Sequence, residues 1–366
     1  MRAGRAESTA DEELRTRGMT MTARTKAARD LLGLDIPLIA APMAGGATTA
    51  QMVIAAADAG GMGFLAAGYK TPQVLLTEIA TVRKASIPFG VNIFAPNPVP
   101  IDAASYRQYA HLVQEVAYRF ELELPSDPIE DDDAFGAKID LLLTDPVPVV
   151  SFTFGLPGGD VIARLKKAGT IVVQTVTNTV EATAAAEAGA DLVVAQAGAA
   201  GGHSGTFTPD RPLAGVAVND LVAEVSATVN IPVIAAGGLA SAEAVSEVLG
   251  FGAVAAAVGT VLLRADESAA SPTHKAALID PARNETVLTR AFTGRPARGL
   301  RNAFIDRFEA GAPLGYPAIH HLTSPLRKAA AAAGVDDLVH LWAGTGYRRV
   351  RDESTATILA GLARNG

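Results

Sequence analysis

The chain has 366 residues, of which 49% are hydrophobic and 19% are charged, and its formal net charge is −7. An acidic chain without a basic cluster does not favour nucleic-acid binding, which depends on cations that neutralise phosphates. The absence of cysteine excludes disulfides and thiolate chemistry. No apolar run reaches the roughly 18 residues that span a bilayer. We therefore expect a cytoplasmic protein that binds neither nucleic acid nor membrane.

Residues 1–30 mix both charges and contain no apolar segment. This composition predicts a disordered or loosely helical leader and not a secretory signal. From residue 36, short apolar runs alternate with alanine-rich helical segments. The predicted strands are 36–43, 62–68, 87–94, 147–155, 170–176, 190–198, 231–238 and 253–263.

These eight runs are continuously hydrophobic, which is typical of strands buried on both faces. The helices predicted between them are 49–60, 71–85, 160–169, 179–189, 218–229 and 241–252. Eight strand–helix units with right-handed crossovers predict an α/β protein with a (β/α)8 TIM barrel over residues 31–265.

Two segments depart from this alternation. Residues 95–146 separate the third and fourth strands and predict a helical excursion, in which the acidic run at 130–133 forms a solvated turn. Residues 266–366 predict a C-terminal helical region packed over one end of the barrel.

The loops after the seventh and eighth strands predict a phosphate site. Gly237 and Gly238 precede a helix, and Gly259 and Thr260 end the last strand. Glycine lets backbone N–H groups approach an anion, and the dipole of a helix N-terminus favours negative charge. A plain turn is the alternative interpretation of each loop.

Polar side chains end two other strands. Asn92 and Gln196 either tie off backbone groups or hydrogen-bond a polar heterocycle, and their spacing does not separate these readings. His203 follows the sixth strand, so we expect it over the barrel mouth, where a neutral imidazole can accept or donate a proton. The other histidines are predicted to be structural or solvated: His111, His274, His320, His321 and His340. No cluster in the sequence has the ligand spacing of a metal site.

Several motifs, taken in order, resemble the nitronate monooxygenases, also called 2-nitropropane dioxygenases, which are FMN-dependent barrels. The first five are "APMAGG" (41–46), "FGVNIFAP" (89–96), "AQAGAAGGHSG" (195–205), "IPVIAAGG" (231–238) and "VGTVLLRADES" (258–268). Those that indicate the bacterial-type class are "GRPARGLRNAF" (294–304), "LTSPLRKAAAAAG" (322–334) and "LWAGTG" (341–346). The resemblance runs from about residue 34 to the C-terminus.

The resemblance implies FMN as cofactor. It places Pro42 and Met43 along the flavin ring and implies that Asn92 and Gln196 contact FMN. It also implies that His203 is the active-site base or the electrostatic partner of the nitro group. It implies that backbone amides hold the phosphate, in the residues Gly201, Gly237, Gly238, Ala257, Val258, Gly259 and Thr260.

Three residues depart from the family pattern. Ala199 stands where the family usually has Glu, Ser204 where it often has Arg, and Ala257 where it often has Gln. The first two replacements predict an unusually neutral setting for His203.

The resemblance also implies an activity, the oxidation of alkyl nitronates such as propionate 3-nitronate by O2 to a carbonyl compound and nitrite. Its small-molecule partners are then a nitronate or nitroalkane and O2. Two alternatives stay open: an FMN-dependent NAD(P)H reductase of the enoyl-acyl-carrier-protein or quinone reductase type, and a flavin- or phosphate-binding protein without catalysis. The sequence leaves the physiological substrate and the oligomeric state open.

Overall fold

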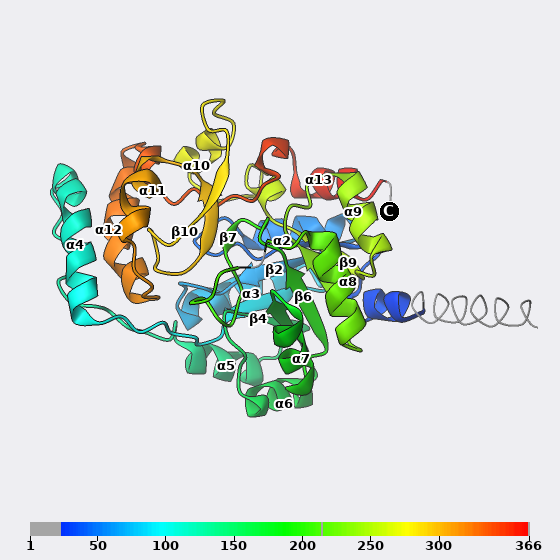
Figure 1. Ribbon diagram of the computed structural model, residues 1–366. Coiled ribbons are helices and arrows are strands. Elements are labelled where there is room, and N and C mark those ends of the chain that lie inside the picture. Colours follow the sequence, from blue (N-terminus) through cyan, green and yellow to red (C-terminus); the bar gives the residue numbers. More distant parts are fainter. Residues whose placement is uncertain (1–22, 214, 365–366) are drawn as a thin grey trace, which may run out of the picture.

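The computed structural model describes residues 23–213 and 215–364. Eight parallel strands close into a barrel in the order β1-β2-β3-β4-β5-β6-β8-β9 (Figure 1). The barrel strands are β1 (Leu38–Ala40), β2 (Met62–Ala66), β3 (Gly90–Phe94), β4 (Val149–Thr153), β5 (Ile171–Val176), β6 (Leu192–Gln196), β8 (Val233–Ala236) and β9 (Ala255–Val258). The predicted (β/α)8 fold is confirmed, and each strand lies inside its predicted range.

Eight helices of the described residues follow the barrel strands and form the outer ring. They are α2 (Ala50–Asp58), α3 (Pro72–Arg83), α5 (Phe135–Thr144), α6 (Gly159–Lys167), α7 (Thr179–Glu187), α8 (Val218–Thr228), α9 (Ala242–Gly250) and α13 (Thr355–Leu362). Side-chain caps begin several of them, as where Ser241 accepts from the amide of Ala244 at the start of α9. The last helix, α13, packs against α2 and α9 and so takes the eighth place in the ring.

The other elements form a cap over one end of the barrel (Figure 1). The cap comprises α4 (Ala103–Ala117), β7 (Gly202–His203), α10 (Pro272–Ala277), β10 (Thr286–Thr289), β11 (Ala297–Leu300), α11 (Ala303–Phe308) and α12 (Ala318–Ala332). Short 3-10 helices are η1 (Tyr118–Phe120), η2 (Thr260–Leu262), η3 (Glu309–Gly311), η4 (Asp336–Leu338) and η5 (Tyr347–Arg349). The cap has its own apolar core, in which Tyr109 of α4 meets Phe308 of α11 with ring centroids 6.4 Å apart.

The predicted excursion at 95–146 therefore serves two parts of the fold. Its first helix, α4, packs on α12 in the cap, whereas its second, α5, lies in the barrel ring between α3 and α6. The region after residue 265 is likewise not only helical. Strands β10 and β11 form an antiparallel hairpin, and β11 also pairs with β7, where Ala297 lies opposite His203. This pairing fixes the backbone of His203 against the cap.

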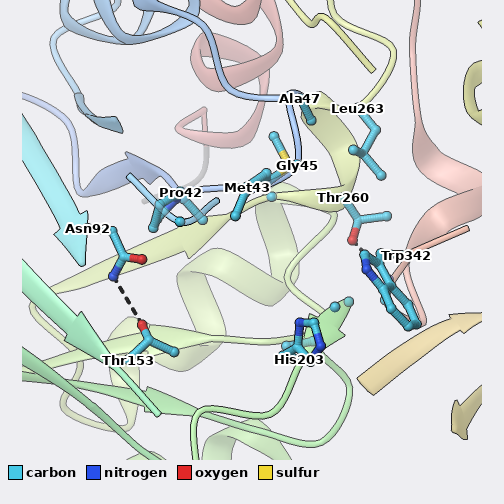
Figure 2. A pocket seen from close by; sticks show the side chains of 18 of the residues that line it. Pro42, Met43, Gly45, Ala47, Asn92, Thr153, His203, Thr260, Leu263 and Trp342 are labelled. Atoms are coloured by element: carbon cyan, nitrogen blue, oxygen red, sulfur yellow. Dashed lines mark hydrogen bonds between the residues drawn. The ribbon is translucent and has the colours of Figure 1, made fainter. Parts of the chain in front are cut away.

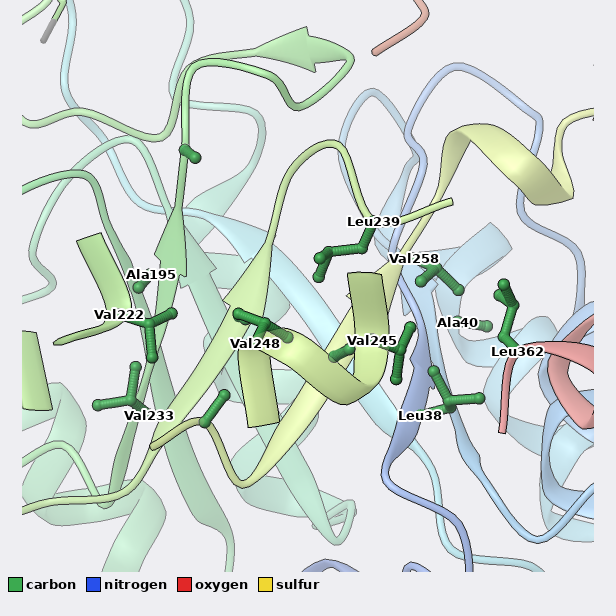
Figure 3. Close-up of a cluster of buried hydrophobic side chains, with 14 of the residues drawn as sticks. Leu38, Ala40, Ala195, Val222, Val233, Leu239, Val245, Val248, Val258 and Leu362 are labelled. Atoms are coloured by element: carbon green, nitrogen blue, oxygen red, sulfur yellow. The ribbon is translucent and has the colours of Figure 1, made fainter. Parts of the chain in front are cut away.

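Apolar side chains fill the barrel and the layer around it. Figure 3 shows the outer layer, where Leu38 and Val233 on strands face Val222 of α8 and Val245 of α9. Burying one such side chain contributes about 1.5–3 kcal/mol. Residues 23–32 are helical, and their Leu32 belongs to the apolar cluster inside the barrel. The rest of the predicted leader, residues 1–22, lies outside the described residues.

The acidic turn at 130–133 is not wholly solvated. Asp133 accepts a hydrogen bond from the amide of Tyr69 at 2.9 Å and pairs at 2.7 Å with Nζ of Lys138, whose side chain is fully buried. Asp131 lies 2.7 Å from Nε2 of His321 on α12. The prediction of a solvated turn is wrong for Asp133, because this turn joins the barrel to the cap. Of the helices in residues 23–213 and 215–364, none combines the length and the hydrophobicity of a membrane-spanning segment.

Candidate active site

A cavity of about 710 Å³ lies between the barrel and the cap, a volume typical of small-molecule sites. Every site residue selected from the sequence lines this cavity. These residues are Pro42, Met43, Asn92, Gln196, Gly201, His203, Gly237, Gly238, Ala257, Val258, Gly259 and Thr260. Figure 2 labels Pro42, Met43, Asn92, His203 and Thr260 among them, together with Trp342 from the cap. The structure thus brings these residues together, and the contacts predicted for them with FMN stay predictions.

One wall of the cavity is a cradle of backbone amides. Gly237 and Gly238 have φ of +110° and +77°, values that L side chains rarely adopt. Among the residues that the structure describes, the N–H groups of both glycines donate to no protein acceptor, and neither do those of Gly259 and Thr260. The helix α9 begins four residues after Gly238. Unpaired amides beside a helix N-terminus form a site suited to an anion.

Asn92 lies on β3 and is almost fully buried. Its Nδ2 donates to Oγ of Ser151 at 2.9 Å and to Oγ1 of Thr153 at 3.0 Å, the second of which is drawn in Figure 2. The amide nitrogen is therefore occupied by neighbours on β4. Its Oδ1 has no donor within the described part of the chain, so this oxygen is left to accept a hydrogen bond from a ligand.

Gln196 ends β6 and holds the loop that carries His203. Its Nε2 donates to the carbonyl oxygen of His203 at 3.3 Å, and its Oε1 accepts from the amide of Gly205 at 2.7 Å. The side chain thus ties off backbone groups, which is one of the two readings that the sequence left open. Glu181 holds the next part of the loop, where it accepts from Oγ1 of Thr206 at 2.7 Å.

His203 shares a hydrogen bond with Thr293 of the cap. Its Nε2 lies 3.0 Å from Oγ1 of Thr293, and that hydroxyl donates its single proton to the carbonyl oxygen of Arg295 at 3.2 Å. When the Thr293 hydroxyl donates to Arg295 in this way, Nε2 of His203 donates to Thr293 and the lone pair of the imidazole is on Nδ1. Burial first, and then the charges of Arg295 and Arg327, lower the pKa of His203 to about 3. The imidazole is therefore neutral at pH 7.

The predicted neutral setting of His203 is wrong, because these two arginines supply positive charge that the sequence around the histidine lacks. Ser204 does not line the cavity, and its amide donates instead to the carbonyl oxygen of Pro296 at 2.9 Å. The buried guanidinium of Arg295 lies 4.3 Å from the ring centroid of Phe154.

Aromatic rings enclose His203. The ring centroids of Phe154, Tyr316 and Trp342 lie 5.5, 5.8 and 5.5 Å from the imidazole centroid. Phe154 has a φ of +84°, a strained value for a side chain of this size. Its carbonyl oxygen accepts from Nδ2 of the half-buried Asn97 at 2.7 Å and from Nη2 of the buried Arg295 at 3.3 Å, and these two donors stabilise this conformation. These rings form an aromatic wall around the imidazole, which is half-buried where it lines the cavity.

Sequence reasoning missed several cavity residues from the cap. His274, His320 and His340, which the sequence predicts to be structural or solvated, line the cavity, and Arg327 lines it as well. His320 and Arg327 lie on one face of α12 at i and i+7, and this spacing was a signal that could have found them. The exposed His111 of α4 fits the prediction. Within the described ranges, no group of three or more His, Asp or Glu side chains could hold a metal ion.

A closed parallel barrel with a capped cavity at the end of its strands defines a TIM-barrel enzyme. The model of the family described as nitronate monooxygenase matches residues 27–362. The chain belongs to the nitronate monooxygenase family and is an oxidoreductase, which confirms the resemblance seen in the sequence.

Individual relatives agree with this assignment. A probable nitronate monooxygenase of Staphylococcus aureus (strain Newman) is 36% identical over 337 residues, which cover 91% of this chain and 94% of that protein. The crystal structure of nitroalkane oxidase from Streptomyces ansochromogenes has a TM-score of 0.88 and 46% identity, and the match covers 93% of this chain and 97% of that one. The structure of FabK from Thermotoga maritima has a TM-score of 0.72 and 26% identity, over 93% of this chain and 95% of that one.

Proposed function

We propose that the protein is an FMN-dependent nitronate monooxygenase, which oxidises alkyl nitronates with O2 to a carbonyl compound and nitrite. The observation that carries this proposal is the presence, in one capped cavity, of a neutral histidine and a cradle of unpaired backbone amides. Membership of the nitronate monooxygenase family supports the same reaction.

The residues of the cavity fit FMN. The unpaired amides of Gly237, Gly238, Gly259 and Thr260 suit a phosphate dianion, since each offers a donor that no acceptor within residues 23–213 and 215–364 uses. The free Oδ1 of Asn92 suits a ring N–H. Met43, Ala257 and Val258 give the cavity an apolar wall against which a flat ring can pack. When bound there, FMN supplies the redox chemistry that the side chains themselves lack.

His203 serves as a proton acceptor in this proposal. A nitroalkane must lose its α-proton to become a nitronate, and the lone pair on Nδ1 of His203 can take that proton. A nitronate has already lost this proton and carries a negative charge, so a neutral imidazole does not by itself attract the nitronate. The buried cations Arg295 and Arg327 supply the positive potential that favours the anion over its neutral parent.

The proposal is tested by measuring nitrite release from a nitronate and from its parent nitroalkane. We expect the protein to use both, and we expect His203→Asn to keep its flavin spectrum while turnover of the nitroalkane falls about 100-fold or more. Turnover of the preformed nitronate should fall much less, because that reaction needs no proton acceptor. A flavin-containing protein that releases no nitrite from either compound refutes the proposal, and NAD(P)H oxidation in its place would indicate the reductase alternative.

A further inference from the structure

Arg327 is a buried cation without a carboxylate partner in the described part of the chain. It lies on α12 with a residue exposure of 5%. Its Nε donates to Oγ1 of Thr323 at 3.0 Å, and its Nη2 donates to the carbonyl oxygen of His320 at 2.9 Å. Burying a charge with only neutral partners is costly. This arrangement therefore points to a role beyond packing.

The guanidinium assigns the proton on His320. Nη2 of Arg327 lies 3.3 Å from Nδ1 of His320, and because guanidinium nitrogens only donate, Nδ1 must accept. The proton of the neutral ring is then on Nε2. Burial and the adjacent charge of Arg327 lower the pKa of His320 well below its usual 6.5, so the ring stays neutral at pH 7.

The ring of His320 is also fixed in orientation. It stacks on Tyr69 with ring centroids 4.2 Å apart and an interplanar angle of 2°. Tyr69 is itself held, since its amide donates to Asp133. His320 lines the same cavity as His203, and its Nε2 has no acceptor among the described residues. The cavity thus contains one histidine whose free nitrogen accepts and another whose free nitrogen donates.

We propose that His320 donates a hydrogen bond from Nε2–H to a nitro or nitronate oxygen of the substrate, and that Arg327 is the positioning residue that fixes this tautomer. The inference rests on the proposed function for the identity of the substrate. Nitronate charge is concentrated on its two oxygens, which makes them strong acceptors for a donor in a water-poor site. His203 then meets the carbon end of a nitroalkane, where the proton leaves, while His320 meets the oxygen end.

The tautomer is measured directly, without turnover, by two-bond 1H–15N NMR spectra of the holoprotein labelled with 15N-histidine. The signals of His320 are those absent from the spectrum of His320→Phe. We expect the Nε2–H pattern for this ring, and its conversion to a mixture of tautomers in Arg327→Met. An Nδ1–H pattern or a protonated ring for His320 at neutral pH overturns the proposal.

The role in turnover is measured with two substitutions that keep a ring stacked on Tyr69. His320→Phe removes the donor, and we expect kcat/KM for a nitronate to fall about 10- to 100-fold, as for the loss of a hydrogen bond to a charged group. His320→Tyr restores an O–H donor and should recover most of that loss. His111→Phe, at an exposed position of α4 outside the cavity, serves as the control for a histidine-to-phenylalanine change.

The outcomes separate this inference from the proposed function. Nitrite release by the wild type together with unchanged kcat/KM in His320→Phe overturns the role of His320 alone. Equal losses in His320→Phe and His320→Tyr also overturn it, because they show that the ring packs and does not donate. Absence of nitrite release already in the wild type overturns the proposed function and, with it, the nitronate as the acceptor.

Discussion

Replacing Gly238 by alanine should weaken FMN binding far more than it destabilises the fold. Gly238 has a φ of +77°, and a Cβ built there would lie 3.1 Å from Cβ of Ala199 and 3.3 Å from Oγ1 of Thr345. Both contacts are tight, so the loop that carries the unpaired amides of Gly237 and Gly238 must shift. The backbone strain of an alanine in this region is about 1–2 kcal/mol.

The expected loss of affinity follows from the amides that the shift misaligns. A hydrogen bond to a charged group contributes about 1.5–3 kcal/mol, so misaligning one amide of the cradle raises the Kd for FMN about 10- to 150-fold. The assay is titration of apoprotein with FMN, followed by flavin fluorescence, alongside thermal unfolding of the apoprotein.

Gly334→Ala is the matched control, because Gly334 follows α12 with a φ of +71° and a Cβ there would meet nothing within 4 Å. Both variants should lose similar stability, about 1–3 °C in Tm for a protein of this size. Only Gly238→Ala should lose FMN affinity. Equal Kd values for the two variants would refute the assignment of the cradle to the phosphate.

Two further predictions concern stability. Burial lowers the pKa of His203 to about 3 and that of His274 to about 4, from 6.5 when unfolded. Below pH 6.5 the unfolded chain therefore binds more protons than the folded chain. The free energy of unfolding should fall by about 1.4 kcal/mol per pH unit for each of these histidines as the pH drops from 6.5 to about 4. A free energy of unfolding that rises on acidification over this range contradicts the prediction. Arg295→Met should lower the free energy of unfolding, measured with denaturant, by about 3 kcal/mol or more, because the guanidinium donates to backbone carbonyls of three loops. Arg301 is exposed, so Arg301→Met should lower it by at most about 1 kcal/mol. Similar losses for both arginine variants would show that the buried cation does not join these loops.

The sequence predicted the barrel because its signals are local. Each strand is a short apolar run, and a strand buried on both faces needs such a run whatever its neighbours are. The cavity residues of the barrel followed from the same pattern, since the carboxyl ends of parallel strands meet at one end. Gly237, Gly238 and His203 could be placed there from their position after a strand alone.

The cap could not be predicted in the same way because its contacts are non-local. Strand β11 has the sequence "ARGL", whose central residues are arginine and glycine, and it pairs with β7, which has only two residues. Neither strand therefore shows the alternation of apolar and polar residues that predicts a strand. Helix α13 completes the barrel ring although the cap separates it from β9 in sequence. The roles of His320 and Arg327 depend on a hydrogen bond across two turns of α12 and on a ring from the barrel, which composition does not reveal.

The most direct measurement is an anaerobic titration of the purified protein, followed through its visible flavin spectrum, with a nitronate in one experiment and NADPH in the other. FMN-dependent nitronate oxidation predicts that the nitronate bleaches the flavin band, that NADPH does so poorly, and that admitting O2 restores the band with release of nitrite. A flavin band that NADPH bleaches readily and the nitronate leaves unchanged would contradict it.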